Sequence, residues 1–103
     1  HMHSEGYDQD NKKLVRNKIP ELYDGKYYVA DDEEYKQRLF DKMREELDEF
    51  IENPSIEEAA DMLEVLWAIF SAHEMLKYDV VIAANAKVTS RGAFSKRFIW
   101  EKE

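Results

Sequence analysis

Apolar residues in the middle of the chain recur at the spacing of one face of an α-helix. When residues 32–52 are placed at roughly 100° per residue, the apolar ones fall within a stripe about 120° wide. These positions are Leu39, Phe40, Met43, Leu47, Phe50 and Ile51. Asp31 or Asp32 can cap the start of this helix, and Asn53-Pro54 disfavours its continuation. The pattern therefore predicts a long amphipathic helix that ends near Glu52.

A second helix is predicted directly after that turn. Ser55-Ile56-Glu57-Glu58 has the spacing of a capping box, which favours a helix start at Ile56. The segment from Ile56 to about Leu76 is apolar over more than half its circumference, so several of its sides must be covered. A shorter third helix is expected from an Asp79 cap to a stop at Gly92.

Two short runs favour β structure. Tyr27-Tyr28-Val29 follows the turn dipeptide Asp24-Gly25, and Phe98-Ile99-Trp100 lies near the end of the sequence. With only 3 Gly and 2 Pro, the rest of the chain favours long helices. The predicted fold class is therefore mainly α, an antiparallel helical hairpin with a small β-ribbon from the terminal segments.

The apolar second helix also predicts self-association. One hairpin and a short helix cannot enclose Leu66, Trp67, Ile69 and Phe70 on all sides. We therefore expect a homodimer or a higher homo-oligomer, in which helices from the copies complete a four-helix bundle.

Composition narrows the class of protein. Hydrophobic residues make up 44% of the 103 residues, which predicts one globular domain over 7–103, and residues 1–6 resemble an expression-tag remnant. The net charge of −8 argues against a nucleic-acid polymer as partner. The absence of cysteine excludes thiolate zinc sites and a cysteine nucleophile. Without a long apolar run or a recognisable signal peptide, we expect a cytoplasmic protein that does not bind a membrane.

The charges are unevenly distributed. Residues 31–64 contain 14 acids and four bases, whereas residues 12–18 and 87–97 contain eight of the 15 bases. Lys87 and Arg91, four residues apart, form a basic stripe that can anchor phosphates or simply complement a helix C-terminus. An acidic centre between two basic segments suits a metal ion with an anionic ligand.

Four acids are predicted to face one another across the hairpin. If the chain folds back at Asn53-Pro54, Glu49 is level with Glu58 and Glu46 is level with Asp61. Each helix contributes one pair at i, i+3, which places both members on one face. Facing helices lie roughly 8–10 Å apart, so the carboxylates can converge on one cation. Oxygen ligands alone favour Mg²⁺, Mn²⁺ or Ca²⁺ over zinc.

Each acid also has an explanation without a metal. Glu58 can be the capping-box acid of Ser55, and Glu49 can be a solvated residue on the helix surface. Glu46 lies at the margin of the apolar stripe and Asp61 interrupts an otherwise apolar helix, where an unpaired charge is costly. These two positions discriminate a metal site from a non-catalytic helical interaction module, in which the acids would form a solvated face, and the spacing alone leaves both open.

Three segments together resemble the MazG-like nucleotide pyrophosphohydrolases, in particular the phosphoribosyl-ATP pyrophosphohydrolase-like branch of the all-α NTP pyrophosphatases. Residues 11–21 (NKKLVRNKIPE) are similar to the opening signature of that branch. Residues 45–50 and 57–65 resemble its Glu-x-x-Glu and Glu-x-x-Asp blocks, and residues 87–97 resemble its basic tail.

The resemblance implies Mg²⁺-dependent cleavage of a nucleoside triphosphate between the α- and β-phosphates, with Mn²⁺ as a substitute. The products would be a nucleoside monophosphate and pyrophosphate. It also implies homo-oligomerisation. The implied metal ligands are Glu46, Glu49, Glu58 and Asp61, and either Glu46 or Glu49 would accept the proton of the attacking water.

Four basic residues are the candidates for substrate binding. Lys87 and Arg91 match the tail of the family, and Arg16 and Lys18 lie in the opening signature. Asn17 replaces the usual Asp of that signature, and Ala93 replaces the usual second Gly of the tail, but neither departure affects the four acids. Phosphoribosyl-ATP is an alternative substrate, because its hydrolysis uses the same metal and the same type of bond.

Overall fold

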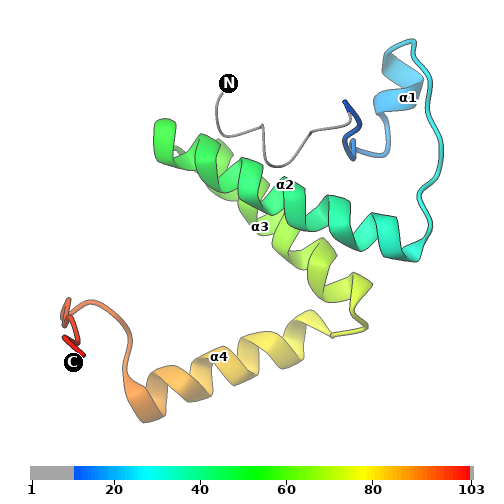
Figure 1. The fold of residues 1–103 in the computed structure, drawn as a ribbon. Helices are drawn as coiled ribbons and strands as arrows, with labels where there is room; N and C mark the ends of the chain where they lie inside the picture. The colour runs from blue at the N-terminus through cyan, green and yellow to red at the C-terminus, as the bar shows by residue number, and fades with distance from the viewer. Residues whose placement is uncertain (1–10, 103) are drawn as a thin grey trace.

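The computed structural model describes residues 11–102, and these residues are mainly helical (Figure 1). Four helices follow one another along the chain: α1 (Ile19–Leu22), α2 (Asp32–Glu52), α3 (Ile56–Ala72) and α4 (Lys77–Arg91). Among residues 11–102, no helix combines the length and the apolar character needed to cross a bilayer. The predicted tag remnant, residues 1–6, lies outside the described residues.

The two long helices of the hairpin begin where the sequence predicts. Asp31 caps α2, and its Oδ1 accepts a hydrogen bond from the Glu34 backbone N–H at 2.8 Å. Ser55 caps α3 in the same way, with its Oγ accepting from the Glu58 N–H at 3.2 Å. The end of α2 at Glu52 also agrees with the sequence pattern.

The end of α3 differs from the prediction, which extended this helix to about Leu76. The helix ends at Ala72, and His73 at the C-cap position is no longer helical. The His73 N–H closes the last turn on the carbonyls of Ile69 and Phe70, and Glu74 adopts a left-handed φ of 60°. This turn redirects the chain into α4.

The start of α4 also differs from the prediction. The helix begins at Lys77 with Leu76 at the cap position, so Asp79 is not the cap but a residue of the first turn. Its negative charge is still favourable there, because the N-terminus of a helix is partially positive. The helix ends as predicted at Gly92, whose φ of 87° is readily adopted by glycine.

The hairpin of α2 and α3 provides the packed part of the molecule. Leu39 on α2 is only 3% exposed, and it is the one buried hydrophobic residue among residues 11–102. Residues 11–16 lie against the hairpin before the turn that leads into α1, with Lys13 paired to Glu45 of α2 and Arg16 paired to Asp61 of α3. This N-terminal arm brings basic side chains to the acidic face of the hairpin.

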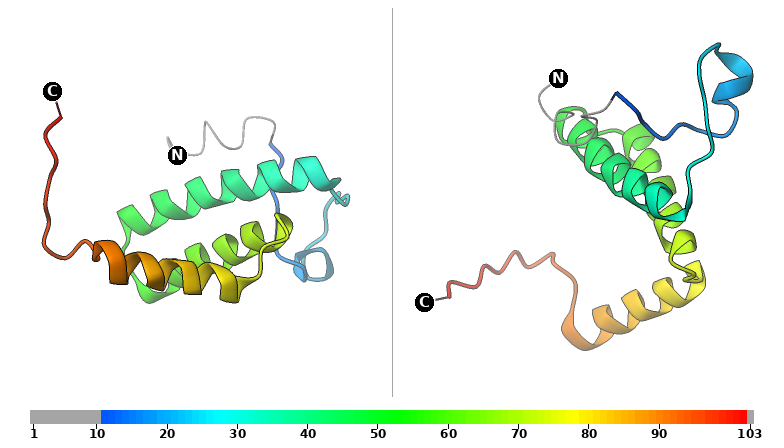
Figure 2. Two further views of the ribbon diagram at one scale, coloured as in Figure 1. Left: turned by 90° about the horizontal axis from the view of Figure 1, so that it is seen from below. Right: turned by 45° about the vertical axis from the view of Figure 1, so that its right-hand side comes forward.

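α4 diverges from the hairpin, and the chain changes direction after its end at Gly92 (Figure 2). Large apolar side chains along this arm are exposed, among them Tyr78, Ile82, Phe94 and Trp100. The predicted four-helix bundle requires helices from a second copy, so it stays a prediction.

The predicted β-ribbon is not formed among residues 11–102. Residues 27–29 and 98–100 belong to extended segments, and no strand is paired within residues 11–102. The short helix α1 was not predicted; Pro20 lies in its first turn, where a missing backbone N–H costs nothing.

Candidate metal centre

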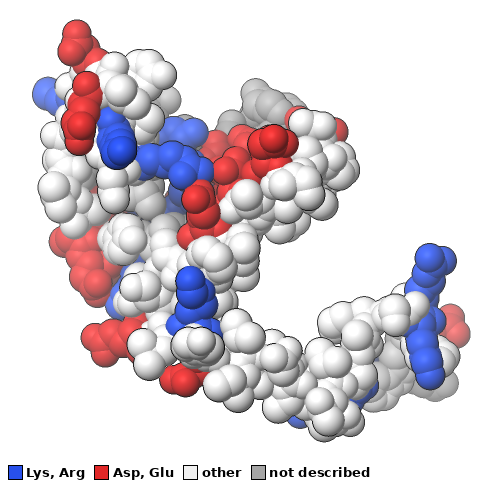
Figure 3. Space-filling model, turned by 180° about the vertical axis from the view of Figure 1, so that it is seen from behind, with Lys and Arg blue, Asp and Glu red and all other residues white. Residues whose placement is uncertain are grey.

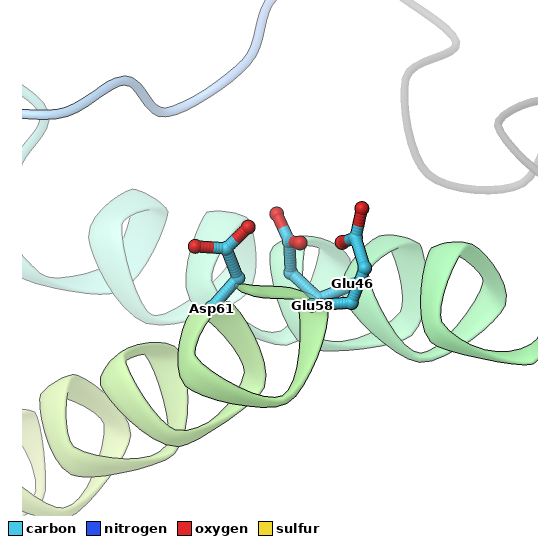
Figure 4. Close-up of side chains that lie close together, drawn as sticks. All are labelled: Glu46, Glu58 and Asp61. Carbon is cyan, nitrogen blue, oxygen red and sulfur yellow. The ribbon is translucent and has the colours of Figure 1, made fainter. Parts of the chain in front are cut away.

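Three carboxylates converge on one side of the hairpin (Figure 4). Glu46 comes from α2, whereas Glu58 and Asp61 come from successive turns of α3. One ligand oxygen from each residue lies within 4.8 Å of the other two. The predicted convergence of these three residues across the hairpin is therefore confirmed as geometry.

Glu46 is the most unusual member of the group. It is 7% exposed, and its Oε1 is buried without a hydrogen-bond partner. The Nζ of Lys42 lies 3.6 Å from the other oxygen, Oε2. Burial raises the pKa of the Glu46 carboxyl, and the charges of Glu49 and Asp61 raise it further, against the opposite effect of Lys42. An ionised carboxylate in this position is therefore poorly compensated.

Glu58 shares this lack of compensation, and its contact with the cap residue Ser55 is made by its backbone N–H. Its Oε1 is also buried and has no partner. Desolvation raises the pKa of Glu58, and the negative charges of Glu49 and Asp61 add to the effect. Helix capping by Ser55 involves only the backbone N–H of Glu58, so its carboxyl group remains available for a second task.

Glu49 adjoins the three converging acids without belonging to their closest group. Its charge raises the pKa values of both Glu46 and Glu58. The four predicted acids therefore form one electrostatic unit. The geometry places three of them at the centre and Glu49 at the side.

Arg16 is the candidate substrate-binding residue that reaches this centre. Its Nη2 lies 2.9 Å from Oδ1 of Asp61 and 2.7 Å from Oε1 of Glu64. These contacts, chiefly the one with Glu64, raise the pKa of the guanidinium and keep it charged. A cavity of about 190 Å³ opens here, and Arg16, Glu46 and Asp61 are among its lining residues.

The other three candidate substrate-binding residues are not at the carboxylates. Lys18 is exposed at the N-cap position of α1. Lys87 and Arg91 lie in the last part of α4, on the arm that leaves the hairpin. Figure 3 shows acidic side chains around a hollow with basic ones beside them, and other basic side chains at the distant end of that arm.

Two neighbours of the centre lie outside the four predicted acids, and both had a sequence signal. Lys42 precedes Glu46 by four positions, which is the spacing of a helical ion pair. Glu64 follows Asp61 by three positions, and the sequence marks it as a fifth acid on the same face. Its contact with Arg16 depends on the path of the N-terminal arm and has no local signal.

His73 has a packing role. Its Nδ1 lies 2.9 Å from the carbonyl oxygen of Ile69, and its ring lies 5.7 Å from that of Phe40 between centroids.

Comparison with known protein families, curated proteins and solved structures finds no match to this chain.

Proposed function

We propose that the protein is a Mg²⁺-dependent nucleoside triphosphate pyrophosphohydrolase that cleaves the bond between the α- and β-phosphates. The observation that carries this proposal is the unpartnered Oε1 of Glu46, buried within a group of three converging carboxylates. Buried polar atoms without a partner are rare and need an explanation. A divalent cation satisfies this oxygen and removes the repulsion among the acids.

The donor set suits the proposed metal. Glu46, Glu58 and Asp61 offer only carboxylate oxygens, which favour Mg²⁺ or Mn²⁺ over softer metals. Glu49, whose charge acts on both Glu46 and Glu58, would be the fourth acid. When bound, the cation would neutralise phosphate charge and make water more acidic. Glu46 or Glu49 would then accept the proton of the attacking water, because both carboxylates belong to the same electrostatic unit.

We also propose that two or more copies associate to complete a four-helix bundle. The support is the exposed apolar surface, which includes Leu66 and Trp67 of α3, each 39% exposed, and Ile82 of α4, 62% exposed. Strands of the predicted β-ribbon would then come from different copies. In such an assembly, Lys87 and Arg91 can act at the carboxylates of a partner, since α4 carries them away from those of its own chain.

Two alternatives use the same observations differently. Phosphoribosyl-ATP is an alternative substrate, because hydrolysis of its pyrophosphate bond would use the same metal and the same carboxylates. A non-catalytic helical interaction module is favoured by the exposed apolar arm alone. The burial of Glu46 favours the enzyme, because a solvated acidic face requires no buried carboxylate.

The decisive experiment is a pyrophosphate-release assay with a panel of nucleoside triphosphates and phosphoribosyl-ATP. We expect release of pyrophosphate in Mg²⁺ or Mn²⁺ and none in EDTA. Glu46→Gln or Asp61→Asn should lower turnover by about 10²-fold or more. Glu101→Gln, an exposed acid of the C-terminal segment, is the matched control and should not change turnover. Release of orthophosphate alone, or a rate that EDTA does not change, would contradict the proposal.

A further inference from the structure

One nitrogen of Arg16 contacts two acids, of which only one belongs to the converging carboxylates. Asp61 belongs to the three converging carboxylates, whereas Glu64 lies outside that group. The Nη2 of Arg16 contacts both, at 2.9 Å and 2.7 Å. The guanidinium therefore stands where a cation that uses Asp61 would have to compete with it.

We propose that Arg16 is a tethered counter-ion of Asp61, which gives up this carboxylate to the divalent cation and, held by Glu64, then binds the anionic ligand of that cation. This inference rests on the proposed function, because it requires a metal at Glu46, Glu58 and Asp61. It assigns Arg16 two successive partners, a carboxylate before metal binding and a phosphate oxygen afterwards.

The exposure of the pair makes such an exchange feasible. The side chain of Arg16 is 65% exposed and that of Asp61 is 36% exposed. Ion pairs at exposed positions contribute little to stability, so a divalent cation can displace the guanidinium. A deeply buried pair would resist this exchange.

Glu64 explains why Arg16 would remain in place after losing Asp61. It provides the shorter of the two contacts, and it is not needed by the three converging acids. Arg16 also lines the same cavity as Glu46 and Asp61. A guanidinium has five N–H donors, so the contact with Glu64 leaves others for a phosphate.

Lys13 offers a matched control on the same N-terminal arm. It pairs with Glu45 at 3.1 Å, and Glu45 is not among the three converging acids. Lys13→Gln and Arg16→Gln remove the same charge from the same segment. A difference between the two variants therefore reports the local contact with Asp61 rather than the net charge of the protein.

The test measures Mn²⁺ binding to the full chain without nucleotide, by calorimetry or electron paramagnetic resonance. Arg16→Gln should bind Mn²⁺ on the order of tenfold more tightly than wild type, because a positive charge next to the ligand is removed. Lys13→Gln should change the affinity by no more than about twofold. Arg16→Lys, which keeps the charge, should stay close to wild type. Thermal unfolding of each variant verifies that it is folded.

The second measurement uses inorganic tripolyphosphate with Mn²⁺ as the probe, so that no nucleobase is involved. Arg16→Gln should bind this complex about tenfold more weakly than wild type. Arg16→Lys should lose part of the affinity, because lysine lacks the planar fork of donors. The expected signature is thus tighter metal binding together with weaker binding of the polyphosphate.

Three results would overturn the inference. Equal Mn²⁺ affinities of wild type and Arg16→Gln would mean that Arg16 does not compete for Asp61, while the proposed function would stand. If Lys13→Gln increased the Mn²⁺ affinity as much as Arg16→Gln, the effect would come from the net charge of the protein and not from the contact with Asp61. If wild type binds no Mn²⁺ at all, the proposed function fails together with this inference.

Discussion

The ammonium group of Lys42 lies 3.6 Å from Oε2 of Glu46, whereas Oε1 of the same carboxylate is buried without any partner. The Glu46 side chain, 7% exposed, thus has a nearby positive charge at Oε2 only. The residue is stabilised enough to be kept in the interior, yet one oxygen remains unpartnered. This asymmetry is the basis of the first prediction.

Neutralising Glu46 should stabilise the metal-free protein and reduce its response to metal. Burial and the nearby negative charges disfavour the ionised carboxylate, so Glu46→Gln should raise the melting temperature in EDTA by a few degrees, on the order expected for a gain of about 1 kcal/mol. The further stabilisation by Mn²⁺ should fall, because a ligand is lost.

The measurement is thermal unfolding of wild type, Glu46→Gln and the exposed control Glu101→Gln, each with EDTA and with saturating Mn²⁺. Functional sites often carry such a stability penalty, so the opposite signs of the two effects are the diagnostic result. If Mn²⁺ raised the melting temperature equally in all three proteins, Glu46 would not be a metal ligand.

Stability of the metal-free protein should increase when the pH is lowered from neutral to mildly acidic values. Folding raises the pKa values of Glu46 and Glu58 above the ordinary 4.5. The resulting penalty is present above the raised values and is removed as the pH falls through them towards 4.5. At lower pH the trend reverses, because Glu34 has a pKa lowered by its hydrogen bond with Tyr28, and its contribution is lost on protonation.

Urea unfolding over a pH series, at constant protein concentration, checks this trend. The Mn²⁺-loaded protein should behave oppositely, because protons and metal compete for the same carboxylates. Its affinity for Mn²⁺ should begin to fall at a pH above 4.5, the ordinary value for glutamate. A metal-free stability that is flat from neutral pH down to this value would contradict the assignment.

Activity should be restored when two inactive variants are mixed. Glu46→Gln removes a central acid, and the double variant Lys87→Ala with Arg91→Ala removes the basic stripe of α4. If the stripe acts on the carboxylates of a partner, random exchange of subunits gives mixed dimers with one intact site, and about a quarter of wild-type activity returns.

The exchange is performed by mixing the two variants under mild denaturant, followed by removal of the denaturant and the pyrophosphate assay. Each variant treated alone provides the control. Light scattering should give at least a dimeric mass for every sample. A monomeric mass, or a mixed sample no more active than its components, would exclude the shared site.

Truncation of Leu39 should destabilise the hairpin strongly. Leu39 is 3% exposed where α2 packs on α3, so Leu39→Ala should lower the free energy of unfolding by about 2–4 kcal/mol. Leu22→Ala in α1, where the side chain is 67% exposed, should change it little. Urea unfolding of both variants at one protein concentration tests the difference.

Local signals in the sequence predict the hairpin well. The caps at Asp31 and Ser55 and the end of α2 at Glu52 depend on contacts within a few residues, so these boundaries can be read from the chain. The convergence of Glu46 with Glu58 and Asp61 follows from helical spacing and one tight turn. These predictions succeed because helix geometry is regular and short-ranged.

The failures occur where the chain changes direction. No glycine or proline marks the end of α3 at Ala72, and no polar cap residue marks the start of α4 at Lys77. A left-handed Glu74 with the hydrogen bonds of His73 makes that turn. The β-prone runs lack pairing partners within residues 11–102, since strand pairing requires a second segment at the right distance.

The sequence by itself determined the helical class, the two long helices and the acids that face each other across them. Only the tertiary structure placed Arg16 at Asp61, across 45 positions of the chain, and left Lys87 and Arg91 on the outlying arm. The reason is physical: periodicity and capping report energies within one helix, whereas the path of an arm depends on contacts between residues far apart in sequence.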